Sequence, residues 1–177
     1  NREMSTLSQG GYRYNSAKVI RVITGVYVFF TVAAFLSLWA AGMTFFDAVN
    51  HAFSLAATGG FSTRNLSVGY YDSDLINLVV MIFMAVCAMH FGLVYAVFVT
   101  RSFKPMNNTV VKYYFGSIAV CSIIVAFSLM SEGGYSNWGR ALMDSSFTVI
   151  SYMSTCGFGI CDNSAWPWIA GIVLLFV

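Results

Sequence analysis

The 177-residue chain is short of charge. Charged residues make up 9% of it and hydrophobic residues 58%, whereas soluble proteins average roughly a quarter charged and half apolar residues. Three long stretches contain no Asp, Glu, Lys or Arg, and they lie between Arg21 and Asp47, between Asp74 and Arg101, and between Lys112 and Glu132. Each approaches the roughly 20 residues that a helix needs to cross about 30 Å of hydrocarbon. A fourth apolar run starts near Trp166. The shortage of charge excludes an ordinary soluble protein and predicts an all-α integral membrane protein.

The chain also lacks the side-chain sets of common enzymes. No nucleophile lies beside a base, no glycine-rich phosphate loop follows a strand, and no carboxylates pair at membrane depth, so we expect no enzymatic activity and no cofactor. His51 and His90 invite comparison with the axial ligands of a membrane haem, but a hydrogen-bonded packing role fits better. Cys156 and Cys161 are close enough in sequence for a disulfide on the outer side. Buried cysteines that pack as small apolar groups are the simpler expectation, without a transition-metal site.

The basic residues fix an orientation. Seven of the nine lie before the first apolar run or between the second and third, namely Arg2, Arg13, Lys18, Arg21, Arg101, Lys104 and Lys112. The positive-inside rule makes that side cytoplasmic, so residues 1–18 read as a cytoplasmic connector and residues 101–109 as a cytoplasmic turn. Six of the seven acidic residues then face outward, where their field would concentrate cations. Residues 1–18 have no apolar core typical of a signal peptide. We expect the chain to be an excerpt of a longer multi-pass protein.

A short polar phrase occurs twice. Ser54-Leu-Ala-Ala-Thr-Gly-Gly-Phe-Ser62 returns 97 positions later as Ser151-Tyr-Met-Ser-Thr-Cys-Gly-Phe-Gly159. Threonine, glycine and phenylalanine keep their places, and Asp47 and Asp144 fall at the same offset. Before each phrase lies an apolar segment that is long enough to enter a bilayer but too short to cross it, which is typical of a re-entrant helix. The repeat therefore predicts two units, each built as span, half-helix, polar loop and span.

The segment boundaries follow from these patterns. The first unit covers residues 19–100, with segments 19–42, 44–57, 58–65 and 75–100. The second covers residues 110–177, with segments 110–131, 139–154 and 155–162 and an incomplete last span from residue 166.

Non-helical backbone at membrane depth must line a cavity or be buried in protein. The half-helix before each loop ends with carbonyl groups and about half a negative charge, which stabilises a cation. Backbone carbonyls can replace the hydration shell of potassium, and Gly60 and Gly157 let them converge because no side chain stands in the way. We expect Phe61 and Phe158 to wedge the loops from behind. The predicted potassium-binding filter is Thr58, Gly59, Gly60, Phe61, Thr155, Cys156, Gly157 and Phe158.

These residues carry a family resemblance. Thr155-Cys-Gly-Phe-Gly159 is similar to the filter of potassium channels, but the string from Phe46 to Thr63, with its His-Ala-Phe-Ser-Leu-Ala-Ala-Thr-Gly-Gly-Phe, resembles the Trk/Ktr/HKT family of potassium transporters more closely. So does Met89-His-Phe-Gly-Leu-Val-Tyr95 on the following span. The resemblance implies four such units around one pseudosymmetric pore, of which this chain matches the second and third.

The same resemblance implies the remaining expectations. Filter glycines at Gly60 and Gly157 favour potassium over sodium as the transported ion, in a bacterial inner membrane. The family pairs its pore subunits as homodimers with a cytoplasmic nucleotide-binding regulatory protein, and no nucleic acid is involved. The chain departs from the family pattern at Cys156 and at Asn107-Asn108-Thr109.

Two units cannot close a ring of four, so alternatives stay open. The missing units lie in the same polypeptide, or two copies pair around a pore as in a two-pore-domain channel. A structural or haem-binding membrane subunit, in which the glycine loops are only tight turns, is the remaining alternative.

Overall fold

The computed structural model describes residues 16–89, 108–131 and 135–177. Within these ranges every regular element is helical, which confirms the predicted all-α class. The elements in chain order are α2 (Ser16–Ala40), α3 (Phe45–Ala56), the short 3-10 helix η1 (Ser67–Tyr71), α4 (Asp74–Cys87), α6 (Thr109–Ser131), α7 (Trp138–Met153) and α8 (Trp168–Phe176).

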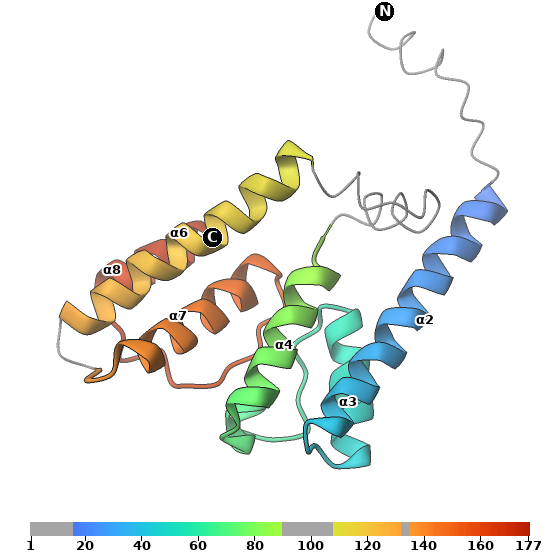
Figure 1. Cartoon of the computed structure of the whole chain (residues 1–177), viewed down its shortest axis with the longest axis horizontal. Coiled ribbons are helices and arrows are strands. Elements are labelled where there is room, and N and C mark those ends of the chain that lie inside the picture. The colour runs from blue at the N-terminus through green and yellow to red at the C-terminus, as the bar shows by residue number, and fades with distance from the viewer. Residues whose placement is uncertain (1–15, 90–107, 132–134) are drawn as a thin grey trace, which may run out of the picture.

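The order of long helix, short helix, loop and helix occurs twice along the chain (Figure 1). Helices α3 and α7 begin and end within one residue of the predicted half-helices 44–57 and 139–154. Helix α4 differs from the predicted span 75–100, because the backbone leaves the helix after Cys87 and the segment from residue 90 lies outside the described residues. The unit boundaries at 19–100 and 110–177 stay predictions.

Side chains close the first turn of both short helices. The Asp47 backbone N–H donates to Thr44 Oγ1 at 3.2 Å, which satisfies one of the N–H groups that a helix start leaves without a partner. At the start of α7 the Gly139 N–H donates to Asn137 Oδ1 at 2.9 Å. These polar caps fix where each short helix begins, so the half-helices start at defined points rather than continuing from the helices before them.

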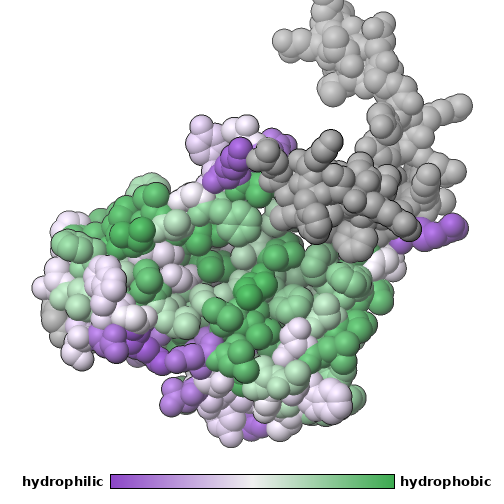
Figure 2. All heavy atoms as spheres, viewed as in Figure 1, coloured by the Kyte–Doolittle hydropathy of each residue, from purple (hydrophilic) through white to green (hydrophobic). Residues whose placement is uncertain are grey.

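Two helices among the described residues have the length and composition to cross a membrane, Ile23–Ala40 within α2 and Thr109–Ser131. Helix α4 is apolar but shorter. Large apolar side chains lie exposed along both long helices, for instance Val32 and Leu36 on α2 and Ile123 and Phe127 on α6. Green hydrophobic residues dominate the face drawn in Figure 2, with purple hydrophilic residues gathered near its edges. An apolar outer surface of this kind suits contact with lipid or with further apolar helices.

The core lies where the short helices pack against the longer ones. Helix α3 contacts α2 and α4, and α4 also contacts α7, so that α4 joins the two halves (Figure 1). The buried stripe of α3 includes Ala48, Ala52 and Leu55, which recur at helical spacing. Phe158 and Cys156 from the second loop belong to the same cluster. A smaller cluster joins α6, α7 and α8 around Val125 and Val149. The second polar loop is therefore anchored in the first half of the chain.

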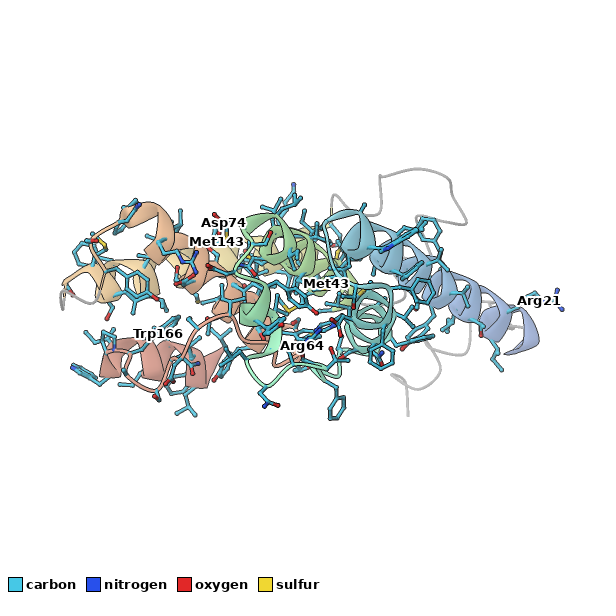
Figure 3. All side chains as sticks on the ribbon, turned by 90° about the horizontal axis from the view of Figure 1, so that it is seen from below. Arg21, Met43, Arg64, Asp74, Met143 and Trp166 are labelled. Atoms are coloured by element: carbon cyan, nitrogen blue, oxygen red, sulfur yellow. The ribbon has the colours of Figure 1, made fainter. Side chains whose placement is uncertain are left out.

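Arg21 is at the far end of α2, away from Arg64 and Asp74 (Figure 3). The predicted orientation, with Arg21 on the cytoplasmic side and Arg64 on the outer side, stays a prediction.

Candidate functional site

The two short helices end in the same way. The Thr58 N–H donates to the Leu55 carbonyl and the Gly59 N–H to the Ser54 carbonyl, at 3.1 and 2.8 Å. Exactly 97 residues later, the equivalent N–H groups of Thr155 and Cys156 donate to the carbonyls of Tyr152 and Ser151, at 2.9 and 3.0 Å. This pair of bonds is a Schellman motif, which ends a helix with one residue in the left-handed conformation. The sequence repeat is thus also a repeat of backbone geometry.

Threonine occupies that left-handed position in both loops. The φ angle is +48° at Thr58 and +55° at Thr155. Helices that end in this way usually place glycine there, and positive φ is a genuine outlier for a β-branched residue. Such strain persists where the surrounding structure holds it, and it clusters at functional sites. Two residues later Gly60 and Gly157 also have positive φ, +66° and +79°.

The two loops touch each other. A methyl group added at Gly60 would lie 1.8 Å from the carbonyl oxygen of Cys156, so no side chain fits between the loops at this point. The Gly69 N–H, on η1, donates to the Gly159 carbonyl at 3.1 Å, and the Gly159 N–H donates to Ser67 Oγ at 3.3 Å. Glycine at position 60 is therefore required by the contact with the neighbouring loop, and η1 holds the end of that loop in place.

The two aromatic residues of the phrases differ in burial. Phe158 is 3% exposed, and its ring lies parallel to the His51 ring of α3, with 5.8 Å between centroids. Phe61 is 80% exposed. The prediction that Phe61 wedges its loop stays a prediction, because among the described residues no half-helix stands against its ring as α3 stands against Phe158. The Phe158 ring stacks on the half-helix of the other unit, and its backbone carbonyl accepts a hydrogen bond from Ser151 of its own half-helix.

An ion pair closes the first loop onto the start of α3. The carboxylate of Asp47, 2% exposed, accepts hydrogen bonds from Thr63 Oγ1 at 2.5 Å and Arg64 Nη2 at 2.9 Å. Burial raises the pKa of Asp47, but the hydrogen bonds from Thr63 and Arg64 outweigh it and hold the pKa well below its usual range. The Arg64 guanidinium also lies over the Tyr70 ring, 4.5 Å from its centroid.

Asp144, the equivalent residue on α7, uses different partners. Tyr135 Oη donates to Asp144 Oδ2 at 2.8 Å, and Arg140 Nε lies 3.3 Å from Oδ1. Burial and this hydrogen bond raise the pKa of Tyr135. Asp47 and Asp144 are two of the six acidic residues expected on the outer side, and both are buried and paired with arginine, so their charge is largely compensated within the protein.

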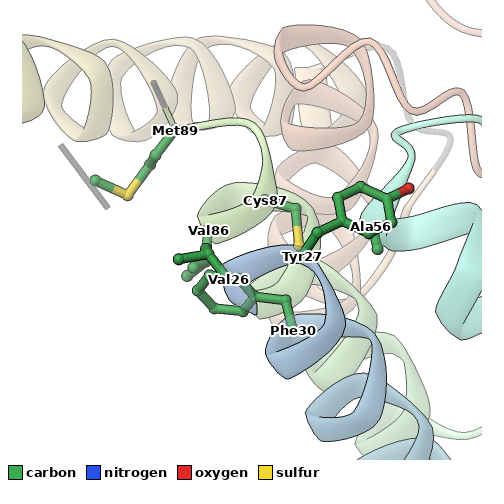
Figure 4. A pocket seen from close by; sticks show the side chains of 7 residues that line it. All are labelled: Val26, Tyr27, Phe30, Ala56, Val86, Cys87 and Met89. Atoms are coloured by element: carbon green, nitrogen blue, oxygen red, sulfur yellow. The ribbon is translucent and has the colours of Figure 1, made fainter. Parts of the chain in front are cut away.

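A cavity of about 660 Å³ opens where the two half-helices end. Residues 56–58 and 153–155 line it, together with Tyr27 of α2 and residues 87–89 at the end of α4. The carbonyl ends of two helix dipoles meet at this cavity, which favours a positive charge there. A much smaller space of about 10 Å³ adjoins it between α2 and the end of α4 (Figure 4).

Neither cysteine pairing nor metal ligation is found in the described part of the chain. Cys156 and Cys161 are both free thiols, so the disulfide considered for them is not formed. Burial raises the pKa of the Cys161 thiol to about 11, which keeps it protonated. The same residues contain no group of three or more His, Cys, Asp and Glu side chains that could hold a metal ion. His51 uses both ring nitrogens in hydrogen bonds to protein, which leaves none for a haem iron. His90 lies outside the described residues.

Several contacts of the site were not anticipated from the sequence. They are the Asp47–Arg64 ion pair, the two hydrogen bonds between η1 and Gly159, and the hydrogen bond of 2.7 Å from Ser151 Oγ to the Phe158 carbonyl. The matched aspartates at positions 47 and 144 were a signal for the first of these. Nothing in the sequence marked η1 as a contact of the second loop.

Helices of membrane-crossing length combined with paired short helices and loops are typical of helical membrane proteins with re-entrant segments. Residues 1–128 match the family described as "TrkH: Cation transport protein". The chain is 32% identical, over 174 residues, to the Trk system potassium uptake protein TrkH of Escherichia coli strain K12, and this match covers 96% of the chain. It is 34% identical, over 169 residues and 90% of the chain, to the protein of the same name from Vibrio parahaemolyticus. The chain belongs to the TrkH family of cation transport proteins.

A solved structure agrees with this assignment. The crystal structure of the potassium transporter TrkH from Vibrio parahaemolyticus superposes with a TM-score of 0.86 at 30% sequence identity, over 96% of this chain and 37% of that one. The chain spans only 35% of the Escherichia coli relative and 34% of the Vibrio one, about a third of each.

Proposed function

We propose that this chain is part of a potassium-uptake transporter and supplies two of the loops that select the ion. The observation that carries the proposal is the matched pair of helix ends, each with a left-handed threonine and, two residues later, a left-handed glycine, at the edge of one cavity. Backbone carbonyls at such helix ends stabilise a desolvated cation. The names of the relatives, Trk system potassium uptake proteins, support potassium as the ion.

The ion-binding groups are the carbonyls of the two loops. Thr58, Gly59 and Gly60 act in the first loop and Thr155, Cys156 and Gly157 in the second, with Phe61 and Phe158 bracing them. Potassium is the transported substrate, and the transporter needs no cofactor and performs no enzymatic reaction.

Two further pore units complete the ring, in the same polypeptide. The second loop supports this, because a methyl group added at Gly157 would have no atom within 4 Å, whereas the equivalent Gly60 lies against Cys156. An open cleft of about 340 Å³ beside Gly157 and Thr148 offers room for another loop. The exposed ring of Phe61 supports a neighbour on the other side. The greater length of the relatives leaves room for two further units.

The remaining features of the proposal rest on the family resemblance alone. The protein is a multi-pass protein of the bacterial inner membrane, with residues 1–18 and 101–109 on the cytoplasmic side. It forms a homodimer and binds a cytoplasmic nucleotide-binding regulatory subunit.

The test is potassium and sodium flux into proteoliposomes that hold the complete protein, with and without Gly157→Ala. Potassium flux that becomes lost or unselective in the variant supports the role of the loop. Unchanged selective flux in the variant would remove Gly157 from the filter. A complete protein that conducts no potassium, with its regulatory subunit added, would contradict the transport function itself.

A further inference from the structure

His51 lies at the junction of the two loops. Its side chain is fully buried, Nδ1 lies 2.7 Å from the Asp47 carbonyl oxygen, and Nε2 lies 2.9 Å from Ser62 Oγ. A carbonyl oxygen only accepts hydrogen bonds, so in the neutral ring Nδ1 carries the hydrogen and donates to it. Nε2 then accepts a hydrogen bond from the Ser62 hydroxyl. The Arg64 backbone N–H donates in turn to Ser62 Oγ at 3.1 Å. This chain of hydrogen bonds ties α3 to the residue that directly follows Phe61.

The faces and edges of the same ring meet aromatic neighbours. The Phe158 ring stacks on it at an interplanar angle of 20°, and the Tyr71 ring of η1 meets it edge-on at 78°, with centroids 6.1 Å apart. Phe158 directly follows Gly157 of the second loop. One buried side chain thus holds the first loop by a hydrogen bond and seats the second loop by stacking.

The second half-helix holds its loop by another residue. Thr148, at the position equivalent to His51, donates to the Asp144 carbonyl at 2.8 Å on its own helix. Ser151 Oγ instead donates to the Phe158 carbonyl, while the equivalent Ser54 Oγ is buried without a hydrogen-bond partner among the described residues. The side-chain anchors therefore differ between the two halves: His51 holds the first loop beside the Asp47 ion pair, and Ser151 holds the second.

We propose that His51 is a positioning residue of the ion-selecting site, which fixes the first loop and the second loop relative to each other. The loops are in van der Waals contact at Gly60 and Cys156, so a shift of one displaces the carbonyl groups of the other. Discrimination between potassium and sodium depends on how those carbonyls are placed. This inference rests on the proposed transport function and adds a side chain outside the repeated phrases to it.

The test compares potassium and sodium flux through the complete protein and its variants in proteoliposomes. His51→Phe keeps a flat ring against Phe158 but removes both hydrogen bonds, and Ser62→Ala removes the bond to Nε2 from the other side. We expect each to lower the preference for potassium over sodium about five-fold. The double variant should lower it by less than the product of the two single effects, because both single variants break the His51–Ser62 hydrogen bond.

Three further variants act as controls. Ser62→Thr keeps the hydroxyl and should keep the preference, and Ser54→Ala removes a hydroxyl without a partner and should also keep it. Ser151→Ala should lower the preference, because it removes the anchor of the second loop.

The outcomes separate this inference from the transport function. Preferences that stay unchanged in both His51→Phe and Ser62→Ala would overturn the role of His51 while leaving a selective transporter. Should His51→Phe fail to fold, the pair Ser62→Ala and Ser62→Thr decides alone. A complete protein without any potassium flux would instead reject the proposed function.

Discussion

At the scale of single residues, the backbone of Thr58 and Thr155 is the most informative feature. A left-handed conformation costs a residue with a β-carbon about 1–2 kcal/mol. Glycine would avoid this cost at both helix ends. The same strained residue type at two equivalent positions points to a requirement of the loop rather than of the helix. Sequence reasoning expected threonine in the filter but not its strain, because the Schellman motif is usually signalled by glycine.

Replacement of Thr58 by glycine should relieve this strain. We expect Thr58→Gly to be more stable than Thr58→Val by about 1 kcal/mol, since valine keeps the β-branch and glycine adopts positive φ freely. The check is the thermal unfolding midpoint of the complete protein in detergent. Thr148→Gly is the control, because the middle of α7 is regular helix, where glycine should lower stability by about 1 kcal/mol. Equal losses in Thr58→Gly and Thr148→Gly would contradict the strain at Thr58.

Gly60 allows a second test. Gly60→Ala or Gly60→Ser must push the loops apart, because the added carbon would overlap the Cys156 carbonyl oxygen. We expect sodium permeation to rise and the preference for potassium to fall about ten-fold, since overpacking of this kind costs about 1–3 kcal/mol. Competing potassium and sodium fluxes measure the change. Gly116→Ala on α6 is the control, because its added methyl group meets no atom within 4 Å. Selectivity retained in Gly60→Ala would mean that the loops do not touch in the working protein.

The Asp47 ion pair has a defined pH dependence. The folded pKa lies below the ordinary value of 3.8, so the pair contributes stability above about pH 4 and loses it as the pH falls through the folded pKa. Asp47→Asn should therefore lower stability by about 2 kcal/mol, because it weakens charge-assisted hydrogen bonds to a buried group. The difference in unfolding midpoint between the two proteins should stay constant from pH 5 to pH 8. A difference that varied within this range would show that Asp47 titrates there.

At the scale of elements, the half-helices were predictable and their contacts were not. The short apolar runs before each phrase predicted helices that end within one residue of α3 and α7, because length alone separates a re-entrant segment from a span. The hydrogen bonds between η1 and Gly159 depend on how loops far apart in sequence meet, and no local sequence pattern encodes that. The role of Phe61 stays a prediction for the same reason, because its ring is 80% exposed and no half-helix lies against it among the described residues.

Arg140 links elements of the two halves. Its guanidinium lies 3.4 Å from Asp74 at the start of α4 and 3.3 Å from the buried Asp144 on α7. Arg140→Gln should lower stability more than Asp74→Asn, because it leaves a buried carboxylate with only the Tyr135 hydroxyl. We expect about 0.5 kcal/mol or less for the exposed Asp74 pair and at least about 1 kcal/mol for Arg140. Thermal unfolding in detergent measures both, and equal small losses would show that the Asp144 pair contributes little.

At the scale of the whole molecule, the second loop packs on the half-helix of the unit before it. Phe158 packs on His51 of α3, and Gly60 packs against the second loop. By analogy with Phe158, we infer that the half-helix of a preceding unit lies against Phe61. Phe61 is 80% exposed in these residues taken by themselves, because the inferred half-helix is not among them. In the complete protein we expect the Phe61 side chain to be buried as Phe158 is.

This expectation can be tested by chemical labelling. In a complete protein without its native cysteines, Phe61→Cys should react with a water-soluble maleimide only after denaturation. Asp72→Cys is the control, because the Asp72 side chain is 89% exposed and no half-helix is expected over it, so it should react in the native state. Phe158→Cys should be protected like Phe61→Cys, because its partner α3 is present in this chain. Rapid native labelling of Phe61→Cys beside a protected Phe158→Cys would mean that no unit precedes the first loop in the ring, and the four-unit pore would then have to be formed in another way.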